Sequence, residues 1–295
     1  MNLAPFRYRN VLSHHGGPIG ATECAMTTVM GQRVFQANAY LKDGLRPMAS
    51  RNVLFGNADG SGTASRPGVA RYKAISEALE RWAHHALHRS GERERYGFDV
   101  DPSSNGMAAF PGLFGRQARR RAWGEAAERF ATIGWWSGAV DAVPAASPWP
   151  GVRAWTIENR VSSHTVVLLH ALADEGVHAY GHGAGETLQQ ACMQAATELA
   201  RSQYVLRRHV RRRQTESAPQ VQGLLERRCV HFSSAEGHAQ VEARLACRAW
   251  RRMEPHVVFD GELVGPWSDY TCVWRVVIEP PSDEFLNEHA AFFYW

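Results

Sequence analysis

The chain of 295 residues is poor in cysteine, which excludes two common ways of stabilising a fold. It has five cysteines, an odd number, and no two of them form a C-x-x-C pair. Disulfide frameworks and structural zinc sites both use paired cysteines at short, regular spacing. We therefore expect reduced thiols with mostly structural roles at Cys24, Cys192, Cys229, Cys247 and Cys272.

The sequence also lacks long apolar runs. Nowhere do 18 uncharged apolar residues follow one another, and the first residues contain no apolar signal-peptide segment. With 44% hydrophobic and 21% charged residues, the composition is that of a globular protein with a real core. We therefore expect no membrane association and a cytoplasmic location.

Lysine is almost absent, since Lys42 and Lys73 are the only two and arginine carries most of the net charge of +4. Arginine-rich runs at 116–121 and 207–213 could bind phosphate, nucleic acid or an acidic peptide. No nucleic-acid-binding motif accompanies them, so solvated helix faces are the favoured interpretation, and we expect no nucleic-acid partner.

The motifs of several enzyme classes are missing as well. There is no GxxxxGK[ST] phosphate-binding loop and no HExxH metal motif. A histidine-based metalloenzyme remains an alternative, although adjacent histidines point to different faces of an element. His182, next to two glycines, could instead contact a nucleotide or be a polar turn residue. The histidines considered are His14, His15, His84, His85, His170, His178 and His182.

Apolar periodicity predicts a mixture of strands and helices. Strands are expected near 33–41, 152–158, 164–172, 256–260 and 271–278. Helices are expected over 67–89, 115–131, 186–209 and 234–247. Because strands and helices do not alternate strictly, the pattern favours an α+β fold over a doubly wound sheet.

An internal repeat is the most informative feature present. Five residues recur with the same displacement of 121 residues, in the pattern G-x-G-x7-A-x3-A-x2-E. Each copy predicts a glycine turn followed by a helix that carries two alanines and one acid on the same side. The paired sets are Gly60, Gly62, Ala70, Ala74 and Glu77, and Gly181, Gly183, Ala191, Ala195 and Glu198.

The acids of the two helices are candidate metal ligands. Glu77 and Glu80 are three residues apart, so both carboxylates can reach one hard cation, and Glu198 could complete the set. Carboxylate oxygens suit Mg²⁺, which usually shares its ligands with substrate phosphates. The alternative is an ordinary surface helix, with ion pairs to Arg81 and His84. The repeat favours the metal site, since surface pairs have no reason to recur beside matching glycines.

At these residues the sequence resembles the YcaO domain family. The resemblance covers roughly residues 10–210, and its strongest part is the pairing of the two helix motifs. It includes GGPIG (16–20) and the strand WTIE (155–158). The two halves of the domain are similar to GSGT (60–63) with ARYKAISEALER (70–81), and to YGHGA (180–184) with ACMQAATELA (191–200).

The resemblance implies an α+β, ATP-binding fold built from two pseudo-repeated halves and lacking a phosphate-binding loop. It implies a single domain over residues 1–279, with half-repeats at about 10–140 and 150–279, and a tail at 280–295.

The resemblance also implies which residues bind ATP and Mg²⁺. Lys73 stands where many members have serine, and an arginine of the run 207–213, taken here as Arg208, would reach the phosphates. The tail has only Pro280-Pro281 in place of a proline-rich end, and a catalytic role near Trp295 stays open. The implied nucleotide-binding residues are Lys73, Glu77, Glu80, Gln194, Glu198 and Arg208, and the implied metal ligands are Glu77, Glu80 and Glu198.

The implied activity is ATP-dependent modification of a ribosomally synthesised precursor peptide. In the family, a Cys, Ser or Thr side chain attacks the preceding carbonyl, ATP phosphorylates the resulting oxygen, and phosphate leaves to give an azoline. Relatives form thioamides or amidines by the same activation. The implied partners are the precursor peptide, an E1-like leader-binding protein, a flavin dehydrogenase and a second copy of the chain. The competing hypothesis is a YcaO-like protein without catalysis that binds a peptide or scaffolds a modification complex.

Overall fold

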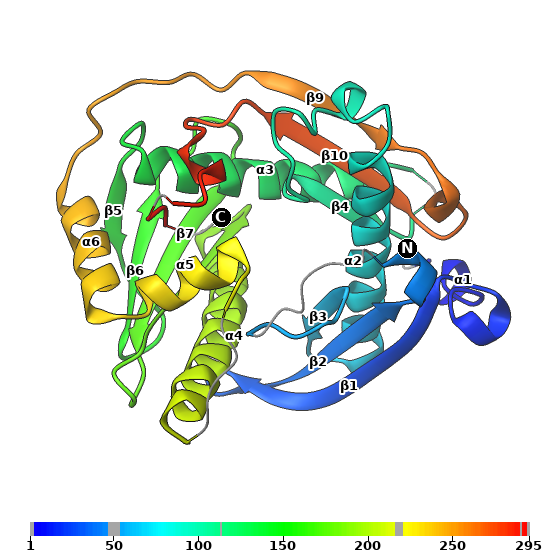
Figure 1. Cartoon of the computed structure of the whole chain (residues 1–295), viewed down its shortest axis with the longest axis horizontal. Helices are drawn as coiled ribbons and strands as arrows, with labels where there is room; N and C mark the ends of the chain where they lie inside the picture. Colours follow the sequence, from blue (N-terminus) through cyan, green and yellow to red (C-terminus); the bar gives the residue numbers. More distant parts are fainter. Residues whose placement is uncertain (1–2, 47–53, 113, 216–220, 290, 294–295) are drawn as a thin grey trace. The chain divides into compact units, whose positions relative to one another are not determined.

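The computed structural model describes residues 3–46, 54–112, 114–215, 221–289 and 291–293, coloured along the chain in Figure 1. These residues form two compact units that interleave along the sequence. Unit 1 comprises Met1–Ala49, Asn57–Ala126 and His256–Glu279, and unit 2 comprises Ser50–Gly56, Ala127–Pro255 and Pro280–Trp295. The predicted division of one domain into two half-repeats stays a prediction.

Unit 1 contains a three-stranded antiparallel sheet covered by a long helix. The strands are β1 (Ile19–Val29), β2 (Gln32–Leu41) and β3 (Gly60–Ala64), in that order, with the short helix α1 (Ala4–Arg7) before them. Helix α2 (Pro67–His88) packs against the sheet through its alanines, Ile75 and Leu79. Most residues of β1 are exposed, and its apolar residues do not alternate regularly with polar ones, which explains why apolar periodicity did not predict its extent.

A second sheet of unit 1 joins segments that are distant in sequence. Strand β10 (Cys272–Ile278) lies between β4 (Met107–Phe110) and β9 (Val257–Leu263), antiparallel to both. Helix α3 (Arg116–Trp136) follows β4, and its first half belongs to unit 1.

Unit 2 repeats the arrangement of an antiparallel sheet followed by a long helix. Its strands follow chain order, with β5 (Ala142–Ala145), β6 (Val152–Ile157), β7 (Thr165–Leu172) and β8 (His178–Gly185). Helix α4 (Leu188–Thr215) packs on β7 and β8, and the shorter helices α5 (Leu224–Phe232) and α6 (Ala235–Ala246) follow it.

The C-terminal segment supplies part of the core of unit 2. Phe292 and Phe293 are buried, and the ring of Phe293 contacts those of Trp135, Trp136 and Phe232. Phe292 and Phe293 are therefore covered within their own unit. Trp295, the predicted location of a catalytic tail, lies outside the described residues.

The predicted strands and helices correspond to β2, β6, β7, β9, β10, α2, α3, α4 and α6, and the α+β class is confirmed. The prediction of glycine turns is wrong, because the first glycine set lies in strand β3 and the second lies in strand β8. Within the part of the chain that the structure describes, no helix is long and apolar enough to cross a membrane.

Candidate functional site

Each glycine-bearing strand lies unusually close to the helix that follows it. A Cβ atom added to Gly60 would lie 2.2 Å from the carbonyl oxygen of Ala74, and one added to Gly181 would lie 2.2 Å from that of Ala195. Such contacts are far inside van der Waals distance, so only glycine lets strand and helix pack this closely. The same close contact therefore recurs 121 residues later, and it explains the repeat as a packing module rather than an anion-binding turn.

The first acid of the module is held by the strand beside it. A carboxylate oxygen of Glu77 accepts a hydrogen bond from the backbone N–H of Ser61 at 2.9 Å and another from its hydroxyl at 3.3 Å. The other oxygen lies 3.5 Å from the guanidinium of Arg81. The helical ion pair expected as the alternative therefore exists, but Glu77 is also oriented by β3.

Glu80 is the most strongly perturbed acid of this helix. Burial raises the pKa of its carboxyl well above the ordinary range, and the nearby carboxyl of Glu125 raises it further. The positive charges of Arg81 and Arg121 act in the opposite direction but do not cancel the effect. Glu125 lies on α3, and sequence reasoning missed it because no motif links it to the repeat.

Lys73 lies on the same side of α2. Its ammonium donates a hydrogen bond to the carbonyl oxygen of Thr63 at 2.9 Å. Partial desolvation, and then the charge of Arg121, lower the pKa of Lys73. Unit 1 thus brings together a cation and three acids from α2 and α3.

In unit 2, Gln194 and Glu198 lie one turn apart on α4. The side chain of Gln194 is exposed, whereas the carboxylate of Glu198 pairs with the guanidinium of Arg201 at 3.3 Å. Among the described residues, no strand N–H donates to Glu198 in the way that Ser61 donates to Glu77. The two copies of the repeat are therefore more alike in their backbone packing than in their side-chain contacts.

The arginine run at the end of α4 is partly neutralised within its own unit. Arg207 and Arg211 each approach the carboxylate of Glu175 at 2.5 Å. These contacts, that of Arg207 first, lower the pKa of Glu175 to about 2. Arg208 is exposed and lines a surface hollow of about 440 Å³ with Arg212. Of the arginines considered for phosphate binding, Arg208 therefore stays a candidate.

His182 does not lie in a turn. It is buried in β8, and its Nδ1 atom lies 2.6 Å from a carboxylate oxygen of Glu128 on the second half of α3. The structure therefore contradicts the turn residue and shows instead a strand residue held by a carboxylate within unit 2.

Two solved structures are similar to the chain over most of its length. The structure of YcaO from Methanopyrus kandleri, bound with AMPPCP and Mg²⁺, matches with a TM-score of 0.53 and 15% identity, over 98% of this chain and 90% of that one. This chain has the YcaO fold. A structure of the E. coli microcin synthetase McbBCD complex with pro-MccB17 bound matches with a TM-score of 0.54 and 10% identity, over 86% of each chain.

At these identities the similarity to YcaO proteins concerns the fold. No family model matches the sequence, and no curated protein is significantly similar to it.

The acids of unit 1 suit a hard cation. Glu77, Glu80 and Glu125 offer carboxylate oxygens, which are the donors that Mg²⁺ prefers. Burial, and then the charge of Glu125, raise the pKa of Glu80, because both disfavour its ionised form. A divalent cation would supply compensating positive charge, so the residues present fit the metal that the resemblance implies.

Proposed function

We propose that this protein is an ATP- and Mg²⁺-dependent enzyme that modifies a ribosomally synthesised precursor peptide by phosphorylating a backbone amide oxygen. The proposed product is an azoline formed by cyclodehydration of Cys, Ser or Thr. One observation carries the proposal. Within a YcaO fold, the same glycine-strand and helix module occurs twice, with an acid at the same position of each helix, Glu77 and Glu198.

The proposed ligands are residues of these two helices. Glu77, Glu80 and Glu198 would hold Mg²⁺, with Glu125 as a further carboxylate near Glu80. Bound Mg²⁺ neutralises charge on the triphosphate, which is the main requirement of phosphoryl transfer.

The remaining residues proposed for the site would bind the nucleotide directly. Lys73 and Arg208 would contact phosphates as cations, and Gln194 would donate or accept hydrogen bonds. The hydrogen bond from Ser61 to Glu77 would keep that carboxylate oriented.

The proposed partners follow from the same fold. The microcin synthetase structure is a complex with a bound pro-peptide, which supports a precursor peptide and partner subunits for this chain too. We propose an E1-like leader-binding protein as partner, a flavin dehydrogenase where azolines are oxidised, self-association into a dimer, and a cytoplasmic location.

Nucleotide binding tests the proposal directly. Isothermal titration with Mg-ATP should show binding by the wild type, weakened at least about tenfold in Glu77→Gln and in Glu198→Gln, since each loses a charged ligand. Glu92→Gln is a matched control, because Glu92 also pairs with an arginine of its own segment, Arg95 at 3.4 Å. If the wild type binds no nucleotide, with or without peptide, the enzyme is excluded and the scaffold hypothesis is favoured.

The product is identified by mass spectrometry of a co-expressed precursor peptide. Cyclodehydration removes one water molecule for each ring formed, whereas thioamide formation exchanges oxygen for sulfur. A peptide of unchanged mass, recovered with every partner present and Mg-ATP bound, would contradict amide activation.

A further inference from the structure

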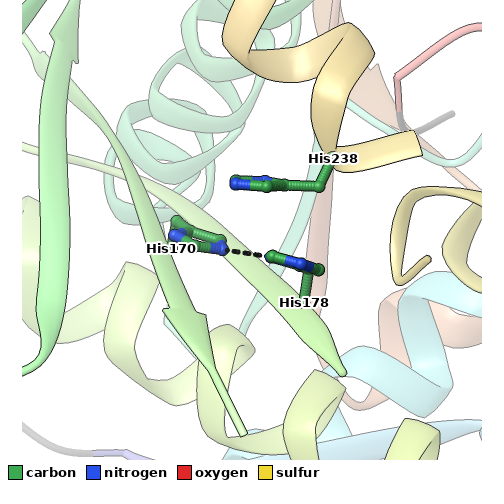
Figure 2. A group of neighbouring side chains, drawn as sticks. All are labelled: His170, His178 and His238. Carbon is green, nitrogen blue, oxygen red and sulfur yellow. Dashed lines mark hydrogen bonds between the residues drawn. The ribbon is translucent and has the colours of Figure 1, made fainter. Parts of the chain in front are cut away.

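Three histidines of unit 2 form a cluster separate from the acids described above. His170 of β7, His178 of β8 and His238 of α6 place ligand nitrogens within 4.8 Å of one another (Figure 2). The Nε2 atom of His170 and the Nδ1 atom of His178 are 3.0 Å apart, and the ring of His238 stacks on His178 with centroids 3.8 Å apart.

Backbone register holds the cluster in place. His170 lies opposite Tyr180 in the β7–β8 ladder, and His178 is two residues before Tyr180, so both imidazoles project from the same face of the sheet. The backbone N–H of His178 donates a hydrogen bond to the carbonyl oxygen of Ser233 at 3.0 Å, just before α6 begins. Segments far apart in sequence are thus fixed around the three rings.

A second layer of polar groups surrounds these rings. The hydroxyl of Tyr180 lies 2.6 Å from Nδ1 of His238, and a carboxylate oxygen of Glu242 lies 3.6 Å from Nε2 of the same ring. Glu242 is in turn held by two hydrogen bonds from Arg153, which balances the charge at this side of the cluster. Metal-binding histidines usually have such a partner on the nitrogen that does not bind the ion, so one of these two contacts would remain and the ion would displace the other.

Of the three histidines, His170 has a buried ring nitrogen without a hydrogen-bond partner in the described part of the structure. The residue is buried as a whole, and the nitrogen concerned is Nδ1. A buried, unpaired ring nitrogen is costly. An ion bound between His170 and His178 would use Nε2 of His170, the nitrogen that faces His178, so Nδ1 would keep its proton without a partner. Burial also lowers the pKa of His170 to about 3, so the imidazole is neutral and offers a lone pair at neutral pH.

We propose that His170, His178 and His238 form a mononuclear Zn²⁺ site. Imidazole nitrogens suit zinc, and three of them leave a fourth position for water or for the carboxylate of Glu242. The ion would join the β7–β8 hairpin to α6 and so stabilise unit 2.

The distances require only local side-chain movement. Nitrogen ligands around tetrahedral zinc at about 2.0–2.1 Å lie roughly 3.3 Å apart. The nitrogens of His170 and His178 are 3.0 Å apart in a shared hydrogen bond. Both rings would tilt so that their lone pairs meet at the ion, and the shared proton would be released. The three rings lie nearly parallel, so the ring of His238 would rotate about its side-chain bonds to direct its lone pair toward the ion.

The site differs chemically from the acids of α2 and α3. Neutral nitrogen donors select zinc, whereas carboxylates that bind together with phosphates select magnesium. The two sites can therefore be tested independently on the same full-length protein.

The test uses full-length protein freed of metal with EDTA and titrated with Zn²⁺ by calorimetry. We expect one equivalent to bind, and the visible bands of tetrahedral Co²⁺ to appear when Co²⁺ replaces it. At roughly 100 times the dissociation constant, Zn²⁺ should raise the midpoint of thermal unfolding by about 5–10 °C.

Variants locate the ligands. His178→Asn and His238→Asn, at half-buried positions, should each weaken Zn²⁺ binding by more than the roughly 10–100-fold cost of losing a second-layer partner. His231→Asn is the matched control, because His231 is a half-buried histidine nearby that bonds Gln240 at 3.3 Å instead. Glu77→Gln should bind Zn²⁺ like the wild type. Failure of the Zn²⁺ site can therefore be distinguished from failure of the nucleotide site.

The proposal is overturned if the wild type takes up no Zn²⁺ at stoichiometric concentration, or if both variants bind it as the wild type does. Circular dichroism checks that the variants fold. Should either fail to fold, ¹⁵N spectra of the wild-type histidines decide the question. Zn²⁺ must then shift the imidazole signals of His170, His178 and His238 together, and a shift of fewer than all three contradicts the site.

Discussion

At the scale of single residues, Glu80 shows how a ligand-binding group can weaken the protein that carries it. Its carboxyl is surrounded by protein and by the acids Glu125 and Glu77, so ionisation is unfavourable in the folded state. Proteins retain such a group at a site where a cation or substrate later compensates the charge. At this position, the group that suits ligand binding therefore lowers the stability of the folded protein without ligand.

Glu80→Gln should stabilise the protein at neutral pH in the absence of Mg-ATP. The folded-state pKa of Glu80 is raised, so its contribution to stability is full below the unfolded value near 4.5 and is lost as pH rises through the folded value. We expect the variant to gain about 1–3 kcal/mol at pH 7 to 8 and almost nothing at pH 4. Urea unfolding at several pH values measures this difference.

Adding Mg-ATP should reverse the order of stability between Glu80→Gln and the wild type, because only the wild type keeps the charged ligand. Glu92→Gln, at an exposed acid, should show neither effect. A Glu80→Gln protein that is less stable than the wild type at pH 8 without nucleotide would show that the carboxylate is already compensated.

At the scale of elements, the glycines set the distance between strand and helix. An added Cβ at Gly62 would lie 2.3 Å from the carbonyl oxygen of Ala70, and one at Gly183 would lie 2.6 Å from the backbone nitrogen of Ala195. Both neighbours are backbone atoms, which cannot move without shifting the helix. The position of each acid-bearing helix thus depends on glycine in the strand beneath it.

Gly62→Ala and Gly183→Ala should each destabilise the protein by about 1–3 kcal/mol, the usual cost of overpacking. Gly68→Ala is the matched control, since Gly68 lies in α2 with nothing within 4 Å of an added Cβ. That control should be neutral or stabilise by up to about 1 kcal/mol, because alanine restricts the unfolded chain. Chemical denaturation distinguishes these outcomes, and equal stability of Gly62→Ala and Gly68→Ala would contradict the close packing.

At the scale of the whole molecule, the described residues of the C-terminal tail complete the core of unit 2. The guanidinium of Arg228 on α5 donates hydrogen bonds to the carbonyl oxygens of Phe285 and Asn287, at 2.7 and 2.9 Å. Burial lowers the pKa of Arg228 to about 10, and the tail backbone supplies acceptors for its charge. Phe293 then fills a space among Trp135 and Trp136.

Phe293→Ala should cost about 3–5 kcal/mol, because it leaves a cavity in the core of unit 2. Leu286→Ala in the same tail should change stability by no more than about 0.5 kcal/mol, since Leu286 is 42% exposed. Thermal unfolding followed by tryptophan fluorescence measures both. Equal midpoints for the two variants would mean that the tail is not part of the core.

Much of this architecture could be predicted from sequence because it depends on local periodicity. Apolar spacing located α2, β2, β6, β7 and β10, since each buries one face or both against its neighbours. The recurrence at 121 residues also pairs Glu77 with Glu198 by their positions in the chain alone. These features reside in the order of residues along the chain.

Only the tertiary structure decided what the glycines contact, because a glycine in a strand and one in a turn look alike until the packing partner is known. The same holds for Glu125 beside Glu80, for His238 beside His170, and for the burial of Phe293. Each depends on segments that are distant in sequence and meet only when the fold forms. Close packing, desolvation and ligand geometry depend on contacts between segments that are distant in sequence, so only the tertiary structure determines them. Periodicity and repetition depend on residue order alone, so the sequence determines them.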